Sequence, residues 1–169
     1  MRLLCLLLLT SGSLAAGGDP EKDHPLGPIE YMVGGTWTAA GEIPGLGRYT
    51  AERTYRWALG GKFIEQRHVM KFSKGEIETK GIIGWDREKR TIAAWGFGDD
   101  GGIATSHAQR TTPTEVRFEG VRVGGFNAGP IRATNKKVSD DEFIEAAEAK
   151  TGNEWRPMFS FRFTRKRGR

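Results

Sequence analysis

Cysteine is almost absent from this 169-residue sequence, since the one residue of this type, Cys5, lies inside an apolar N-terminal run. A chain without that run has no thiol, which excludes disulfides, a thiolate nucleophile and cysteine-based metal sites. Histidine occurs three times, without an H-x-H or HExxH pattern. No G-x-S-x-G motif and no phosphate-binding glycine loop is present either. We therefore expect neither a metal nor a cofactor.

Long apolar runs are confined to the first residues. Arg2 precedes the run Leu3–Leu9, and small residues ending in Ser13-Leu14-Ala15 follow, which is typical of a secretory signal peptide. The run is far shorter than the ~20 residues that span a bilayer. The sequence thus predicts a signal peptide at 1–15, no transmembrane segment, and an exported protein that is periplasmic or secreted.

Charge of one sign does not gather on a predicted face. The formal net charge is +5, and much of the excess lies at the end of the chain, in RFTRKRGR. Nucleic-acid binding would need exposed aromatic and basic residues mixed on one sheet face, and that pattern is absent. No nucleic-acid partner is expected, whereas the basic tail at 167–169 is a candidate for weak contact with anionic polymers.

Helical periodicity is missing after the first forty residues. Residues 16–28 are polar and proline-rich and predict a flexible tether, and Ile29–Val33 predicts a short helix with one apolar face. Turn signals then recur at roughly thirteen-residue intervals. They lie at Pro44–Gly47, Leu59–Lys62, Ser73–Glu76, Asp86–Lys89, Gly98–Gly102, Thr111–Thr114, Gly124–Pro130, Ser139–Glu142 and Thr151–Glu154.

These nine turns separate ten short segments, most of which alternate apolar and polar residues. Ten twisted strands with one apolar face must close or split into two sheets, and the short turns leave little chain for crossings between sheets. The sequence predicts an all-β fold, a single up-and-down antiparallel barrel of about ten strands over 29–166. The segment TEVRFEGVRV departs from the pattern, since its apolar residues change face partway, and it indicates a bulge or bend.

The segment GGKFIEQRHVMKF carries the first candidate site residues. At a period of two, Gln66 and His68 fall between Ile64 and Met70 on the face that looks buried. An amide, an imidazole and an adaptable thioether can line a pocket for a small molecule. A packed wall containing a hydrogen-bonded histidine is the alternative, and the pattern alone leaves both open.

Arg53 is the second candidate. Simple alternation places it inside, between Tyr49 and Tyr55, where a guanidinium needs a carboxylate, a ring face or an anionic ligand as its partner. A bulge that turns Arg53 to solvent is the alternative. Trp85 and Trp95 are expected to form part of the apolar wall of the pocket. For His107, both an inward and an outward position fit the alternation.

Several segments together resemble the lipocalin-like, or calycin, barrels. They are GGTWTAAGE (Gly34–Glu42), WALGGKFIEQRHVM (Trp57–Met70), GIIGWDREKRTIAAWGF (Gly81–Phe97) and FSFRFTRK (Phe159–Lys166). In this order they are similar to a bacterial branch whose members are largely secreted proteins of unknown function. The resemblance implies that Trp37 closes the bottom of the barrel beneath an arginine of the last strand, either Arg162 or Arg165, and that the short helix caps that end.

The resemblance extends to the haem-binding barrels called nitrobindins. Their axial histidine comes from near the C-terminal end of the barrel, and this sequence has no histidine after His107. That site therefore does not carry over, and haem binding through His68 would be a new arrangement.

These observations favour a binding protein for a small, mostly apolar or amphipathic ligand over an enzyme. Arg53, Gln66, His68, Met70, Trp85 and Trp95 are the predicted ligand contacts. One alternative is a small-molecule enzyme of isomerase or cyclase type, with His68 as its acid and base. The other is an envelope interaction module that uses the basic tail.

Overall fold

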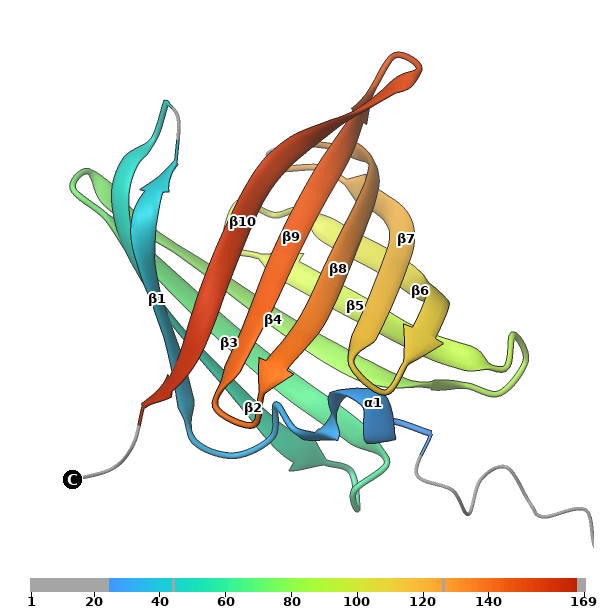
Figure 1. Cartoon of the computed structure of the whole chain (residues 1–169). Helices are drawn as coiled ribbons and strands as arrows, with labels where there is room; N and C mark the ends of the chain where they lie inside the picture. The colour runs from blue at the N-terminus through green and yellow to red at the C-terminus, as the bar shows by residue number, and fades with distance from the viewer. Residues whose placement is uncertain (1–24, 44, 126, 167–169) are drawn as a thin grey trace, which may run out of the picture.

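The computed structural model describes residues 25–43, 45–125 and 127–166. Within these ranges, ten antiparallel strands follow one another round a closed barrel in which β10 pairs with β1 (Figure 1). One short helix, α1 (Gly27–Glu30), precedes them. The strands are β1 (Thr36–Ile43), β2 (Gly47–Ala58), β3 (Phe63–Phe72), β4 (Gly75–Asp86), β5 (Thr91–Gly98), β6 (Ile103–Thr112), β7 (Glu115–Val123), β8 (Gly129–Ser139), β9 (Glu142–Thr151) and β10 (Glu154–Lys166). The predicted up-and-down barrel of about ten strands is confirmed.

Alternation along each strand decides which side chains enter the barrel. In β2 every second residue from Tyr49 to Tyr55 is buried. These residues oppose every second residue of β3 from Gln66 to Phe72. Directly opposed residues of antiparallel strands share a face. The register therefore shows, from strand to strand, which residues of the whole barrel point inward.

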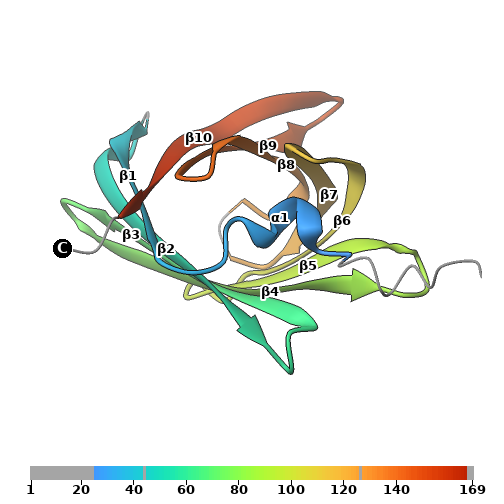
Figure 2. The same ribbon diagram turned by 60° about the horizontal axis from the view of Figure 1, so that its bottom comes forward.

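Trp37 and Arg165 close one end of the barrel, which we call the closed end. The indole Nε1 of Trp37 donates a hydrogen bond to the carbonyl of Met32 at 2.8 Å, which ties β1 to the segment after α1. The guanidinium of Arg165 on β10 lies 4.2 Å from the Trp37 ring and donates to the carbonyls of Tyr31 and Gly34. Viewed from this end, α1 lies across the opening (Figure 2).

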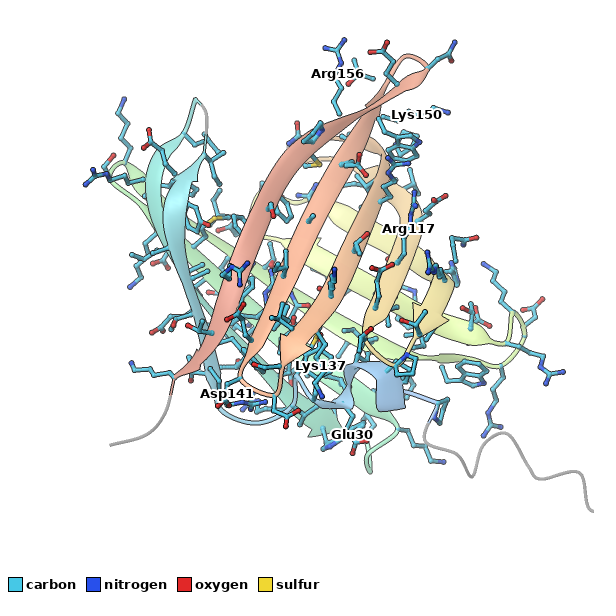
Figure 3. All side chains as sticks on the ribbon, in the orientation of Figure 1. Glu30, Arg117, Lys137, Asp141, Lys150 and Arg156 are labelled. Atoms are coloured by element: carbon cyan, nitrogen blue, oxygen red, sulfur yellow. The ribbon has the colours of Figure 1, made fainter. Side chains whose placement is uncertain are left out.

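The structure decides between the two arginines that the sequence offered for this role. Arg165 stacks on Trp37, whereas Arg162 lies on the outer surface and pairs with Glu142. The two arginines point to opposite sides of β10, because residues 163 and 165 point inward while 162 and 164 point outward. Lys137 and Asp141 also gather beside α1 at this end, whereas Arg156 lies at the far end (Figure 3).

The barrel wall is weakest where its first and last strands meet. Pairing between β1 and β10 covers only Thr36–Thr38 against Thr164–Lys166, whereas β1 pairs with β2 along its full length. Beyond Thr38 the two strands diverge towards the end opposite α1 (Figure 1). Two strand edges therefore face each other without a ladder between them.

The predicted signal peptide at 1–15, most of the tether at 16–28 and the basic tail at 167–169 lie outside the described residues. Leu26 and α1, which follow the undescribed part of the tether, belong to the closed end of the barrel. In the part of the chain that is described, no helix is long and apolar enough to cross a membrane.

Candidate ligand-binding site

A buried ion pair lies inside the barrel. Arg53 points inward from β2 and is 3% exposed. Both terminal nitrogens of its guanidinium contact the carboxylate of Glu145 on β9. The ring of Phe163 lies 4.5 Å from the Arg53 Cζ, and the Tyr55 hydroxyl accepts a further hydrogen bond at 3.2 Å. The guanidinium thus finds two of the partners that the sequence left open, a carboxylate and a ring face.

The pair neutralises its own charge. Burial alone would lower the pKa of Arg53, but the adjacent Glu145 carboxylate outweighs it and raises that pKa above its ordinary value. Burial also raises the pKa of Tyr55 to about 12, although Arg53 opposes the rise. At neutral pH Arg53 is therefore charged and the Tyr55 phenol is protonated.

His68 completes this group from β3. It is 7% exposed, and its Nδ1 lies 2.9 Å from Nη2 of Arg53. A guanidinium can only donate, so Nδ1 accepts and the ring proton sits on Nε2. Nε2 is buried and has no hydrogen-bond partner among the described residues. Burial, followed by the charge of Arg53, lowers the pKa of His68 to about 2.

His68 is therefore expected to stay neutral in the folded protein down to pH 4. Its pKa is about 6.5 in the unfolded chain, so between pH 6.5 and 2 the unfolded state binds more protons. The free energy of unfolding should consequently fall as the pH drops below 6.5, by about 1 kcal/mol between pH 6 and pH 5 from this residue. Nitrogen NMR of the imidazole and urea unfolding at both pH values check this, and His68→Gln should reduce the slope. An imidazolium signal above pH 5 would contradict it.

Glu145 is the site residue that sequence reasoning missed. Its segment, EFIEAAEAK, contains three glutamates. Only Glu145 lies two residues from the buried Phe143 and Ala147, so it points to the same, inner side of the strand. This spacing could have identified Glu145 once Arg53 had been placed inside, because an enclosed guanidinium needs an inward carboxylate on another strand as its partner.

Gln66, Met70 and Trp85, which the sequence also predicted as ligand contacts, lie in different parts of the barrel. Gln66 and Met70 face inward and are half-buried, on either side of His68 along β3. Trp85 also faces inward, but it pairs with Ile92 near the closed end and packs against the core there. The structure therefore brings Arg53 and His68 together and leaves Trp85 well away from Met70.

Trp95 does not line the interior, and that prediction is wrong. The register opposes it to Ile82, which alternates with the inward residue Ile83, so Trp95 lies on the outer face of β5. The sequence of TIAAWGFG did not show which of its residues point inward, because the inward ones are Ile92, Ala94 and a glycine. His107 is likewise outside, where its Nε2 lies 3.2 Å from both Asp86 and Lys89.

The half of the barrel away from α1, which we call the open half, is lined unevenly. Aromatic side chains from β2, β3 and β10 form one side of its wall. The inward residues of β4 to β8, which are mostly small but include Arg122 and Ile131, form the other. The aromatic residues are Tyr49, Phe72, Phe159 and Phe161. The small residues are Gly81, Gly96, Ala104, Ser106, Gly120 and Ala133.

The small-residue wall is partly exposed to solvent. Ala104, Ser106 and Ala133 face the interior, yet each is only half-buried. A Cβ added at Gly96 would meet only Ala104 Cβ at 3.9 Å and the Lys80 carbonyl at 4.0 Å, both on adjacent strands. No atom of the opposite wall comes within 4 Å of that position, so there is free space directly in front of Gly96.

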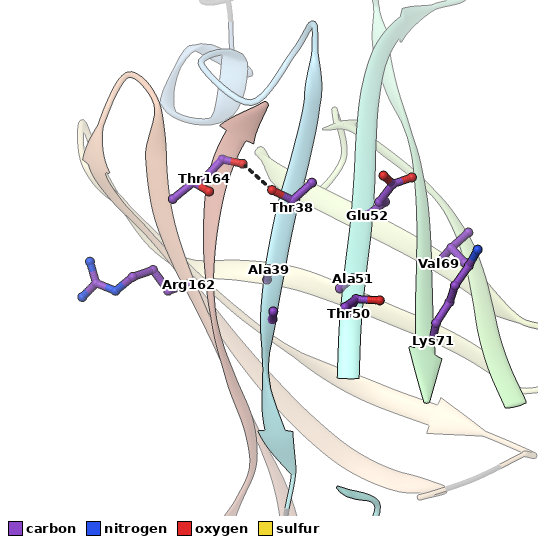
Figure 4. A pocket seen from close by; sticks show the side chains of 10 residues that line it. Thr38, Ala39, Thr50, Ala51, Glu52, Val69, Lys71, Arg162 and Thr164 are labelled. Carbon is purple, nitrogen blue, oxygen red and sulfur yellow. Dashed lines mark hydrogen bonds between the residues drawn. The ribbon is translucent and has the colours of Figure 1, made fainter. Parts of the chain in front are cut away.

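A hollow lies outside the barrel, over the divergence of β1 from β10. Its volume is about 530 Å³, and outward residues such as Thr38, Thr50 and Glu52 line it (Figure 4). Arg162 and Lys71 stand at its borders with their charged ends away from its centre (Figure 4). None of the predicted ligand contacts lies in this groove.

Metal ligands do not converge in the described ranges, where no group of three or more His, Cys, Asp or Glu side chains is placed to hold an ion. The arrangement in the described residues is instead a closed ten-stranded antiparallel barrel with an enclosed, self-neutralised polar cluster and an open half in which small inward residues are partly exposed.

Comparison with known proteins supports the fold. No protein-family model matches the sequence, and no curated protein matches it. The crystal structure of Rv2717c from M. tuberculosis is similar, with a TM-score of 0.63 and 15% identity over 85% of this chain and 98% of that chain. A de novo designed fluorescence-activating β-barrel gives a TM-score of 0.40 and 18% identity over 80% and 94% of the two chains, which is too distant to support an argument.

Proposed function

We propose that this chain is an exported, lipocalin-like (calycin) barrel that binds a small, mostly apolar molecule in its open half. One observation carries the proposal: inward residues of that half are half-buried although they face the interior. A wall of small residues opposite a wall of aromatic rings offers apolar surface on both sides of a bound molecule. The stacking of Arg165 on Trp37 at the closed end is consistent with the lipocalin-like resemblance.

The polar end of the ligand is uncharged in this proposal. The enclosed cation, Arg53, is already paired with Glu145, so a carboxylate would compete with an existing partner. Arg122, which the register sets inward opposite Ala104, is likewise paired, with Asp100. The Gln66 amide is a neutral, half-buried donor on the same face as His68, whose Nε2 is shielded from solvent. A hydroxyl or carbonyl oxygen suits such a donor and avoids the cost of burying an unpaired charge.

The geometry gives less support to the enzyme alternative. A general base that works near neutral pH needs a pKa close to that range, and the pKa of His68 is far below it. Its Nδ1 is occupied by Arg53 and its Nε2 is shielded from solvent. The envelope-module alternative depends on the basic tail at 167–169, which lies outside the described residues, and it stays a prediction.

A competition titration tests the proposal. The neutral dye Nile red should bind the purified chain and gain fluorescence, and decan-1-ol should displace it at a concentration at least tenfold lower than decanoate or decylamine. Absence of Nile red binding would contradict ligand binding in the open half. Tighter displacement by decanoate would overturn only the uncharged end.

A further inference from the structure

Arg122 brings a charged side chain to the inner face of the small-residue wall, near the end of the barrel opposite α1, which we call the mouth. It is the last residue but one of β7, and its side chain is 17% exposed. The register sets it opposite Ala104. It shares an inward row with the predicted ligand contact on β3, and the row runs through Gln66, Gly81, Gly96, Ala104 and Arg122.

The position of Arg122 explains the irregular pattern of TEVRFEGVRV. The register shift lies on β6, and β7 itself alternates without interruption. Phe118 is buried inside, whereas Val121 and Val123 are exposed on the outside. The predicted bulge in β7 is therefore wrong. The apolar residues change face because Arg122 takes the inward position between the two valines.

A carboxylate in the turn between β5 and β6 holds the guanidinium of Arg122. Its Nη2 donates to both carboxylate oxygens of Asp100, at 2.6 and 2.8 Å. The amide of Gly102 donates to the same carboxylate at 3.0 Å, so the turn fixes the position of Asp100. We call Arg122 and Asp100 the rim pair.

The guanidinium lies over glycines on the strands next to β7. A Cβ on Gly102, just before β6, would overlap the guanidinium, and a Cβ on Gly98 would lie 3.0 Å from its Nη2. Gly98 ends β5 and lies two residues from the inward Gly96. Arg122 therefore reaches across the start of β6 to the end of β5 on the inner face of the barrel.

The rim pair borders the free space in front of Gly96 on the side of the mouth. No atom of Arg122 comes within 4 Å of a Cβ added at Gly96. The guanidinium lies instead beside Gly98, two residues or about 7 Å nearer the mouth along β5. An apolar chain that lies in front of Gly96 and extends along this wall toward the mouth therefore meets Arg122.

We propose that the rim pair limits the length of the apolar chain that the open half accepts. This role rests on the proposed function, since it concerns a ligand in the same half of the barrel. A chain that extends past Arg122 must displace a hydrogen-bonded ion pair, and that cost offsets the gain from burying further methylenes. The favoured ligands are those whose apolar chain stops short of the rim pair.

A chain-length series tests this role. Primary alcohols from octan-1-ol to tetradecan-1-ol compete with Nile red for the purified chain. Each added carbon should tighten displacement about fourfold until the alcohol reaches the rim pair, and the affinity should then stop rising. Arg122→Ala should move this plateau by at least two carbons, so that the longest alcohols bind at least tenfold more tightly than to the parent chain. Arg122→Leu, which also lacks the guanidinium, serves if Arg122→Ala loses its native circular dichroism.

Arg117→Ala is the matched control. Arg117 lies on the same strand and also pairs with a carboxylate, that of Glu119, but it alternates with the buried Val116 and Phe118 and points outward. Its plateau should equal that of the parent chain. An unchanged plateau in Arg122→Ala, a parent chain without a plateau, or equal shifts in both alanine variants would overturn the role of the rim pair and leave ligand binding in place. Absence of Nile red binding to the parent chain would overturn the proposed function itself.

Discussion

Replacement of Glu145 by glutamine is expected to lower the free energy of unfolding by about 3–5 kcal/mol. The substitution keeps the shape of the side chain and removes its charge. Arg53, which is 3% exposed, would then lie buried with a charge that nothing neutralises. The loss of a single partner from a buried pair costs more than the pair itself contributes, because the desolvation cost of the remaining ion is no longer offset. Urea unfolding at pH 7 measures the effect.

The chain provides a matched control for this prediction in Glu142→Gln. Glu142 lies on the same strand and also pairs with an arginine, Arg162, but that guanidinium is on the outer surface. Loss of an exposed pair should cost less than about 1 kcal/mol. A second test combines Glu145→Leu with Arg53→Met, which removes both charges and should recover most of the lost stability. Equal costs for the two glutamine variants would show that the inner pair does not carry the stated role.

Ala104→Phe is expected to weaken binding of a neutral apolar ligand at least tenfold, or by about 1.4 kcal/mol. Ala104 faces the interior in the open half, where no opposite-wall atom lies within 4 Å of a Cβ added at the neighbouring Gly96. A phenyl ring placed there would occupy space that the ligand needs, while the sheet ladder stays intact. The Nile red titration measures the affinity, and thermal unfolding checks the fold.

Thr134→Phe adds the same ring to the outside of β8 and should leave the affinity unchanged. Thr134 alternates with the inward Ala133 and opposes Arg117 and Ala146. If both phenylalanine variants bind the dye as the parent does, the dye does not occupy the open half. If both weaken binding equally, the effect is not one of interior space.

The strands and most of the inward residues follow from local sequence, because period-two alternation and turn residues act within a dozen positions. The inward places of Gln66 and His68 were predictable for that reason. The partner of Arg53 was not, because Glu145 lies ninety-two residues away and the pairing depends on how the strands stagger round the barrel. Trp95 was misplaced because in its strand the large residue is outside and the small ones are inside.

The divergence of β1 from β10 could not be predicted from local sequence either. Residues of β1 after Thr38 keep a complete ladder with β2. Whether a strand also finds a partner on its other side is decided by closure of the whole sheet, to which all ten strands contribute. The outer groove over this divergence therefore had no counterpart in the sequence pattern.

Native mass spectrometry of the chain, purified without detergent from the cells that make it, tests the central claim most directly. The account predicts an added mass of a small molecule that is retained under gentle ionisation, is lost on denaturation, and belongs to an uncharged, mostly apolar compound. The Ala104→Phe variant should carry much less of it. A bare chain mass, with no neutral apolar compound binding on titration, would contradict the account and would make the barrel a packed structure with His68 and Arg53 as parts of its wall.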